Sequence, residues 1–106
     1  MAGFVIVSTT TPTREDADSL ARLLVNEHAA ACVQVLGPVA STYRWKGELE
    51  ASEEWLLLIK SAHSRVTLIE RLILENHTYE VPEILVSPVV GGNDSYLAWI
   101  DEAVSE

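Results

Sequence analysis

Residues 77–100 read HTYEVPEILVSPVVGGNDSYLAWI, and this stretch supplies the last strand and the last helix of the predicted fold. The apolar run 84–86 predicts a strand. Pro82 predicts a turn before it, because proline fixes its own backbone and restricts the preceding residue. Gly91 and Gly92 end the strand. The helix that follows is expected to bury Leu97, Ile100 and Val104 and to be capped by Asn93, Asp94 or Ser95.

Three further strands are predicted nearer the amino terminus. Residues 4–11 begin with a continuous apolar run, and residues 54–60 contain another. Uninterrupted runs are typical of strands buried on both faces, so both are expected in the middle of a sheet. Residues 30–45 form a longer strand with a bulge or bend at Gly37-Pro38. Pro38 cannot donate a ladder hydrogen bond, so this strand is expected at an edge.

Two helices are predicted between these strands. The first is expected over about Arg14 to His28, with Thr13 as its N-cap and His28 partly buried near its C-terminus. The second ends near Asn76. Its apolar positions are Val66, Ile69, Leu72 and Ile73, and its expected capping residue is Ser61 or Ser64.

The predicted order of elements is βαββαβ with one added C-terminal helix. An antiparallel sheet of four strands in the order 4-1-3-2 puts the proline-free strands inside and the other two at the edges. This is the ferredoxin-like split βαβ arrangement, an α+β fold. With 106 residues, the chain is expected to form a single domain over residues 1–106.

The hairpin from about residue 30 to residue 60 is longer than one domain can cover. Each arm has roughly fifteen residues, whereas strands usually have about five or six. Tyr43, Trp45 and Leu49 lie near its tip, far from the expected core. An extended ribbon with aromatic residues at its end needs another surface, and a second copy of the chain in a closed ring is the simplest source.

Composition excludes several classes of function. The formal net charge of −9 disfavours nucleic acid and favours cations and basic partners. Cys32 is the single cysteine, so neither an internal disulfide nor a cysteine-based metal site within one chain is expected. No apolar run reaches the length of a membrane span. The start of the chain, Met1 to Phe4, has no basic region and no cleavage pattern of a signal peptide, which predicts a cytoplasmic protein.

Three kinds of site are compatible with the residues. His77, Glu80 and Glu83, close to Tyr79, could bind a divalent cation, although their spacing matches no strong zinc or calcium motif. Lys60 ends a buried strand and needs a partner, which could be Glu80, Glu83 or a bound anion in a pocket at a subunit boundary. An enzyme built on Cys32 is the weakest alternative, because the thiol lies in an apolar strand. Taken singly, the tyrosines, Trp99 and His77 are also typical core, interface or turn residues.

The sequence resembles the CutA family of divalent-cation-tolerance proteins over nearly its whole length. The resemblance rests on the blocks ACVQV, STYRWKGELE, EEWLLLIKS, HTYEVPEILVSPV and GNDSYLAWI. It implies a ferredoxin-like subunit in a tight trimer built by the long hairpins, similar to nitrogen-regulatory signalling proteins. It also implies a link to copper or another divalent cation, and no catalytic reaction.

The resemblance implies a ligand cleft between subunits. Its residues would be Cys32, Tyr43, Trp45, Lys60, Tyr79, Pro82, Tyr96 and Trp99, with His77, Glu80 and Glu83 as the metal ligands. Thr78 departs from the family because many members have proline at that position. Thr9 departs from it because some members have cysteine there. Two hypotheses follow: a cytoplasmic trimer that binds copper without catalysis, and a signalling or adaptor trimer that holds a small anion or a partner loop in that cleft.

Overall fold

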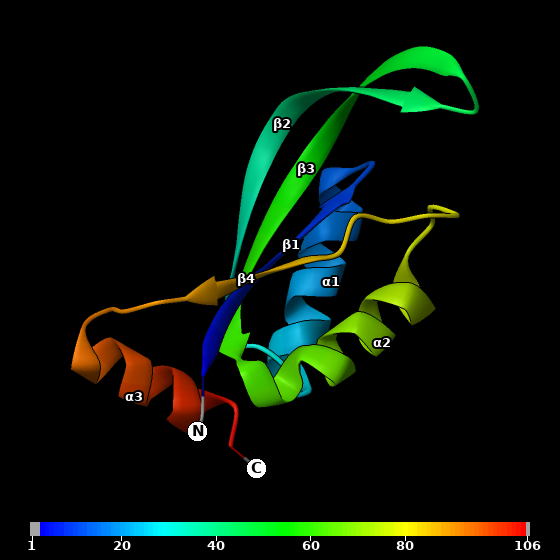
Figure 1. Cartoon of the computed structure of the whole chain (residues 1–106). Helices are drawn as coiled ribbons and strands as arrows, with labels where there is room; N and C mark the ends of the chain where they lie inside the picture. The colour runs from blue at the N-terminus through cyan, green and yellow to red at the C-terminus, as the bar shows by residue number, and fades with distance from the viewer. Residues whose placement is uncertain (1–2, 106) are drawn as a thin grey trace.

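The computed structural model describes residues 3–105. Met1, Ala2 and Glu106 lie outside it, and the first two belong to the stretch on which the expectation about a signal peptide rests. The strands and helices follow one another as predicted (Figure 1). The strands are β1 (Phe4–Thr11), β2 (Cys32–Trp45), β3 (Glu48–Ala62) and β4 (Leu85–Val89). The helices are α1 (Arg14–Asn26), α2 (Val66–Asn76) and α3 (Asp94–Ala103), and a short 3-10 turn, η1 (His63–Arg65), precedes α2. No helix within residues 3–105 is long and apolar enough to cross a membrane.

The four strands form one antiparallel sheet in the order β2-β3-β1-β4, which confirms the predicted ferredoxin-like α+β fold. Both prolines of the sheet lie on edge strands. Pro88 is in β4, which pairs only with β1, and Pro38 lies at a register shift in β2. Each proline lacks an N–H, and an edge strand is where a ladder tolerates that loss.

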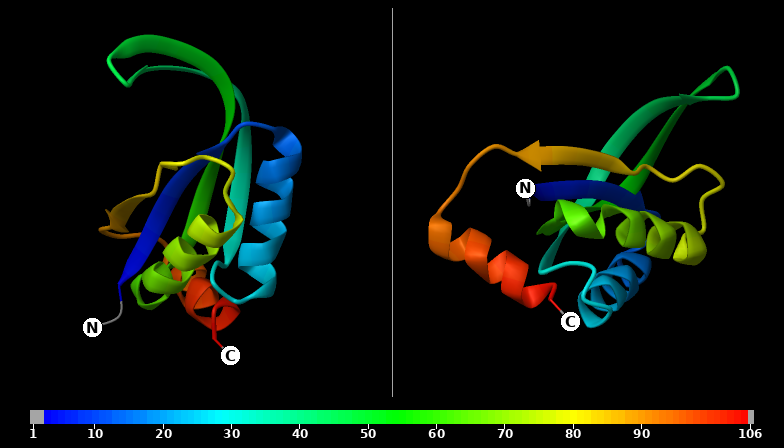
Figure 2. Two further views of the ribbon diagram at one scale, coloured as in Figure 1. Left: turned by 90° about the vertical axis from the view of Figure 1, so that its right-hand side faces the viewer. Right: turned by 60° about the horizontal axis from the view of Figure 1, so that its bottom comes forward.

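One face of the sheet is covered by α1 and α2, which lie on the same side of it (Figure 2). Odd-numbered residues of β1 and β3 point to this face, among them Val7 and Leu57, and both are fully buried. The main core joins them to helix residues Ala17, Leu20, Leu24, Ile69, Leu72 and Ile73.

The second face of the sheet has less cover. At one end α3 packs on it through Ile100 and Val104, which contact Phe4 and Ala62. Further along, Leu56 and Leu58 are half-buried, and Leu36, which pairs with Leu56, is exposed. This apolar strip is called the open sheet face below.

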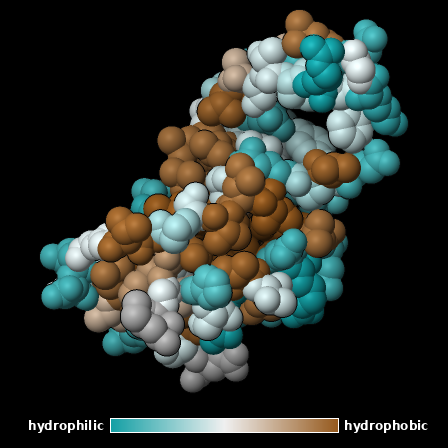
Figure 3. Space-filling view, viewed as in Figure 1, coloured by the Kyte–Doolittle hydropathy of each residue, from teal (hydrophilic) through white to brown (hydrophobic). Residues whose placement is uncertain are grey.

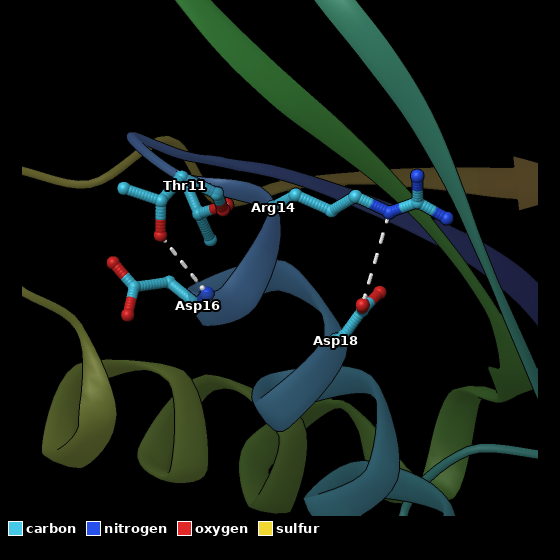
Figure 4. Close-up of polar contacts among 5 residues, drawn as sticks. Thr11, Arg14, Asp16 and Asp18 are labelled. Carbon is cyan, nitrogen blue, oxygen red and sulfur yellow. Dashed lines mark hydrogen bonds and ion pairs between the residues drawn. The ribbon is translucent and has the colours of Figure 1, made fainter.

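The start of α1 matches its prediction. The Thr13 side chain accepts a hydrogen bond from the Asp16 N–H at 3.1 Å. Arg14 pairs with Asp18 at 3.8 Å, as Figure 4 shows. The end of α1 differs from its prediction, because the helix stops at Asn26 and His28 is exposed. His28 has a φ of 57°, a left-handed geometry that turns the chain so that the N–H groups of Ala29 and Ala30 donate to Leu24.

The predicted cap of α2 is wrong. The Ser61 hydroxyl is buried and donates to the Ala29 carbonyl at 2.6 Å, while Ser64 lies inside η1. The cap position is Arg65, whose side chain makes no capping hydrogen bond. The Ser61 hydroxyl therefore links β3 to the segment after α1 and is not available to cap α2.

The hairpin of β2 and β3 arches away from the rest of the chain, at the end opposite α3 (Figure 1). It gives the molecule an elongated shape of 44 × 25 × 22 Å. Near its middle, Gly37 lies against Trp55, and a Cβ at Gly37 would be 2.6 Å from a carbon of that ring. Only glycine fits this contact without displacing the ring.

Candidate functional site

A cleft of about 780 Å³ lies between the hairpin and the segment 78–83. In Figure 3 the surface is hollowed beneath the arched hairpin, and hydrophobic side chains gather over the middle of the molecule. The lining residues are Thr10, Ser41, Thr42, Tyr43, Trp45, Glu54, Thr78, Tyr79, Glu80, Val81, Pro82 and Glu83.

A register shift brings the hairpin residues to this cleft. Leu36 pairs with Leu56, but Val39 pairs with Glu54, so β2 contains one more residue than β3 between these pairs. Because side chains alternate along a strand, one extra residue reverses the face to which the rest of β2 points. As a result Tyr43 and Trp45 share the face of Glu54.

The most buried charge of the cleft is Glu54, which is only 8% exposed. Its Oε2 accepts a hydrogen bond from the Tyr79 hydroxyl at 2.8 Å. Burial, and then the Glu54 carboxylate, raise the pKa of the Tyr79 hydroxyl well above its ordinary value, so Tyr79 remains a donor. Among residues 3–105, no lysine, arginine or histidine lies within ion-pair distance of Glu54.

His77 fixes the segment 78–83 to the sheet. Its Nε2–H donates to the Thr10 carbonyl at 2.6 Å, and its Nδ1 accepts from the Tyr79 N–H at 3.0 Å. The rings of His77 and Tyr79 lie 4.8 Å apart. Both nitrogens of the neutral imidazole are therefore in use, and a metal ion could bind Nδ1 only by displacing the Tyr79 N–H.

The two carboxylates predicted with His77 as metal ligands are in the cleft but differ in burial. Glu83 is half-buried and accepts from the Ser8 hydroxyl at 2.9 Å, whereas Glu80 is exposed. Within residues 3–105, no group of three or more His, Cys, Asp or Glu side chains is arranged to hold a metal ion. As they lie in this chain, His77, Glu80 and Glu83 do not together form a site for a divalent cation.

The cleft contains half of the residues predicted to bind a ligand. Tyr43, Trp45, Tyr79 and Pro82 line it, whereas the other four lie elsewhere. Two of those four, Cys32 and Lys60, are partners in the β2–β3 register at the base of the hairpin. The other two, Tyr96 and Trp99, lie on α3 with ring centroids 5.5 Å apart.

Lys60 pairs with neither of the two carboxylates predicted as its partners. Its ammonium group donates to the Gln34 side-chain oxygen at 2.5 Å, and neither Glu80 nor Glu83 is its partner. Gln34 lies beside it because both side chains point to the open sheet face.

Sequence reasoning missed Glu54, although it is the most buried charge in the cleft. Its even number places it on the same face as Leu56 and Leu58, away from the helices, and this signal was available. Its contact with Tyr79 joins residues 25 positions apart, and no local pattern predicts such a pair. The other lining residues missed are Thr10, Ser41, Thr42, Thr78 and Val81.

Comparison with known proteins gives consistent matches. The family described as "CutA1 divalent ion tolerance protein" matches residues 5–103. The chain is 38% identical to the "Divalent-cation tolerance protein CutA" of Thermus thermophilus, over 92% of this chain and 94% of that protein. It is also 38% identical to "Protein CutA, chloroplastic" of Arabidopsis thaliana, over 91% of this chain and 53% of that protein. The chain thus spans about half the length of that plant relative.

Solved structures agree with the sequence matches. The crystal structure of CutA1 from Oryza sativa superposes with a TM-score of 0.95 at 34% identity, covering 98% of this chain and 95% of that one. The likeness therefore covers nearly the whole of both chains.

Proposed function

The chain belongs to the CutA1 divalent ion tolerance family, and we propose that it acts as a homotrimer that binds divalent cations, copper among them, without catalysing a reaction. The observation that carries this proposal is the chemistry of the cleft. Its described lining includes Glu54, Glu80 and Glu83 and no lysine or arginine. A lining of this charge, on a chain with a formal net charge of −9, attracts cations and repels anions.

Assembly into a trimer is supported by apolar surface that one subunit leaves uncovered. Leu36 is 44% exposed on the open sheet face, and Leu49 is 74% exposed at the hairpin tip. Leu85 on the edge strand β4 is 61% exposed. Neighbouring copies in a closed ring would cover these side chains and the unpaired edges of β2 and β4. The same assembly would bring Cys32, Lys60, Tyr96 or Trp99 of a neighbour toward the cleft.

The cation is proposed to bind at the rim of the cleft, where Glu80 is exposed and Glu83 is half-buried. One subunit does not supply enough ligands, so the remaining ones would come from a neighbouring subunit. His77 is assigned a structural role because both of its nitrogens are engaged. Carboxylate oxygens bind copper less selectively than imidazole or thiolate, so weak binding of several divalent cations is expected.

The signalling or adaptor alternative has one supporting observation. Tyr43, Trp45 and Val81 expose apolar surface in the cleft, which suits a partner loop. A small anion is disfavoured by the carboxylates of the lining. A cytoplasmic location is also part of the proposal, and fractionation of cells that express the tagged chain would test it.

The proposal is tested by calorimetric titration with copper of samples whose mass is measured by light scattering. We expect a mass three times that of the 11.7 kDa chain. The double variant Glu80→Gln/Glu83→Gln should bind copper about tenfold more weakly, equivalent to ~1.4 kcal/mol. The matched control Glu70→Gln/Glu102→Gln removes two exposed charges outside the cleft and should leave the affinity within about twofold of wild type. Equal weakening in both variants, or a monomer, would contradict the proposal.

A further inference from the structure

The two contacts of the His77 ring require one protonation state. Its Nε2 faces the Thr10 carbonyl at 2.6 Å and must carry a proton, whereas its Nδ1 faces the Tyr79 N–H at 3.0 Å and must not. Only the neutral imidazole with its proton on Nε2 satisfies both. Because Thr10 is in β1, this half-buried ring joins the start of the segment 78–83 to the sheet.

A second proton on the His77 ring would break one of these contacts. Protonation turns Nδ1 from an acceptor into a donor, so two N–H groups would face each other across 3.0 Å. The Tyr79 N–H would then lose its acceptor. An arrangement of the segment that frees Nδ1 binds the proton more readily, so a fall in pH favours that arrangement. Imidazoles gain their charge between about pH 8 and pH 5, where most other side chains keep theirs unchanged.

Asp16 is the charged partner that a protonated His77 can reach. It lies on the first turn of α1 (Figure 4) and lines a narrow cavity of about 10 Å³ together with His77. The other residues that line this cavity carry no charge: Thr11, Pro12, Leu20, Asn76 and Thr78. From β3, Glu54 accepts from Tyr79, whose ring lies 4.8 Å from the imidazole, and Glu80 is exposed on the same segment. Within residues 3–105 no carboxylate forms an ion pair with His77 in the present arrangement, so pairing with Asp16 would be a new contact.

We propose that His77 is a pH-dependent switch: the neutral ring fixes the start of the segment 78–83 to β1, and the charged ring releases the Tyr79 N–H and turns toward Asp16. The segment has no helix or strand of its own, so few other backbone contacts oppose its movement. It also forms one wall of the cleft, so the switch sets the position of that wall. All of these contacts lie within one chain, and the switch requires neither the proposed trimer nor a bound cation.

The test is NMR spectroscopy of the full chain between pH 7.5 and pH 5.5, a range in which histidines titrate and ordinary carboxylates stay charged. It reads the nitrogen shifts of the His77 ring and the hydrogen exchange of the Tyr79 amide, corrected for the intrinsic effect of pH. At pH 7.5 the ring should carry its proton on Nε2. One linked proton changes a population by up to about tenfold per pH unit, so the protection of the Tyr79 amide should fall about tenfold as the ring becomes charged. A ring that stays neutral at pH 5.5, a ring with its proton on Nδ1, or a charged ring beside a Tyr79 amide that keeps its protection would overturn the proposal.

Matched variants separate His77 from the other two histidines of the chain. His77→Asn keeps an acceptor near the position of Nδ1 but cannot be protonated, so the protection of the Tyr79 amide should change by less than about twofold over the same range. The control His28→Asn/His63→Asn removes two exposed histidines and should keep the response of the wild type. A response that persists in His77→Asn, or that disappears in the control, would show that another group is responsible.

The role of Asp16 is tested in the same way. Asp16→Asn removes the partner of the charged ring and should move the midpoint of the response to lower pH. Glu15→Gln removes an exposed carboxylate from the same turn of α1, outside the cavity, and should leave the midpoint within about 0.2 pH unit of the wild type. Equal midpoints in the two variants would overturn the pairing with Asp16.

Discussion

Removal of the Tyr79 hydroxyl tests the pairing on which the cleft depends. In Tyr79→Phe the Glu54 carboxylate stays buried but loses its donor, which lies at 2.8 Å. A hydrogen bond to a charged group contributes about 1.5–3 kcal/mol, and we expect a loss of about 2 kcal/mol in the free energy of unfolding. In a Glu54→Gln background the same change removes a neutral hydrogen bond and should cost about 1 kcal/mol.

Urea unfolding of four proteins measures these values: wild type, the two single variants and the double variant, all at one protein concentration. Tyr96→Phe is the control, because that tyrosine is exposed on α3 and should change stability by less than about 0.5 kcal/mol. If Tyr79→Phe costs the same in both backgrounds, or no more than Tyr96→Phe, the carboxylate is not held as described.

The variant Tyr79→Phe also tests how stability depends on pH. The pKa of Tyr79 is raised in the folded chain, first by burial and then by Glu54. As the pH rises above about 10, the unfolded chain loses this proton first, so unfolding releases a proton and stability falls. The wild type should therefore lose stability more steeply than Tyr79→Phe between pH 9 and pH 11. Parallel curves would contradict the assignment.

Three further changes test other parts of the structure. His77→Asn should lower the free energy of unfolding by about 1–3 kcal/mol, measured in urea, and leave the affinity for copper unchanged in calorimetry. If the variant no longer bound copper, His77 would be a ligand. Gly37→Ala should lower stability by about 1–3 kcal/mol, measured by thermal melts, because the added Cβ would meet Trp55. Gly91→Ala is the control and should be nearly neutral, because nothing lies within 4 Å of its added Cβ. Leu36→Glu should dissociate the proposed trimer in sedimentation equilibrium while circular dichroism stays unchanged. A variant that stays trimeric would show that the open sheet face is not the proposed interface.

The sequence predicts the architecture well because the signals for it are local. Uninterrupted apolar runs identified β1 and β3 as inner strands, and prolines identified β2 and β4 as edges. The end of α1 was missed because His28 takes a left-handed geometry that the following buried residues impose. The cap of α2 was missed because Ser61 is used by a distant carbonyl.

Only half of the residues predicted to bind a ligand line the cleft, because the contacts that form it join segments far apart in the chain. The bend at Gly37-Pro38 was predicted, but the side chains beyond it change face only because the register shift adds one residue to β2. The contact between Glu54 and Tyr79, and the two hydrogen bonds of His77, join segments far apart in the chain. Residue type suggested His77 as a ligand, whereas in the structure both of its ring nitrogens form hydrogen bonds.

Anomalous diffraction from crystals of the protein soaked with copper tests most directly whether the cleft binds a divalent cation. We expect an anomalous peak at the rim of the cleft, within coordination distance of Glu80 or Glu83 and of a residue from a neighbouring copy of the proposed trimer. His77 should still be hydrogen-bonded to Thr10 and Tyr79. A peak on the Nδ1 atom of His77, or peaks only at surfaces outside the cleft, would contradict it.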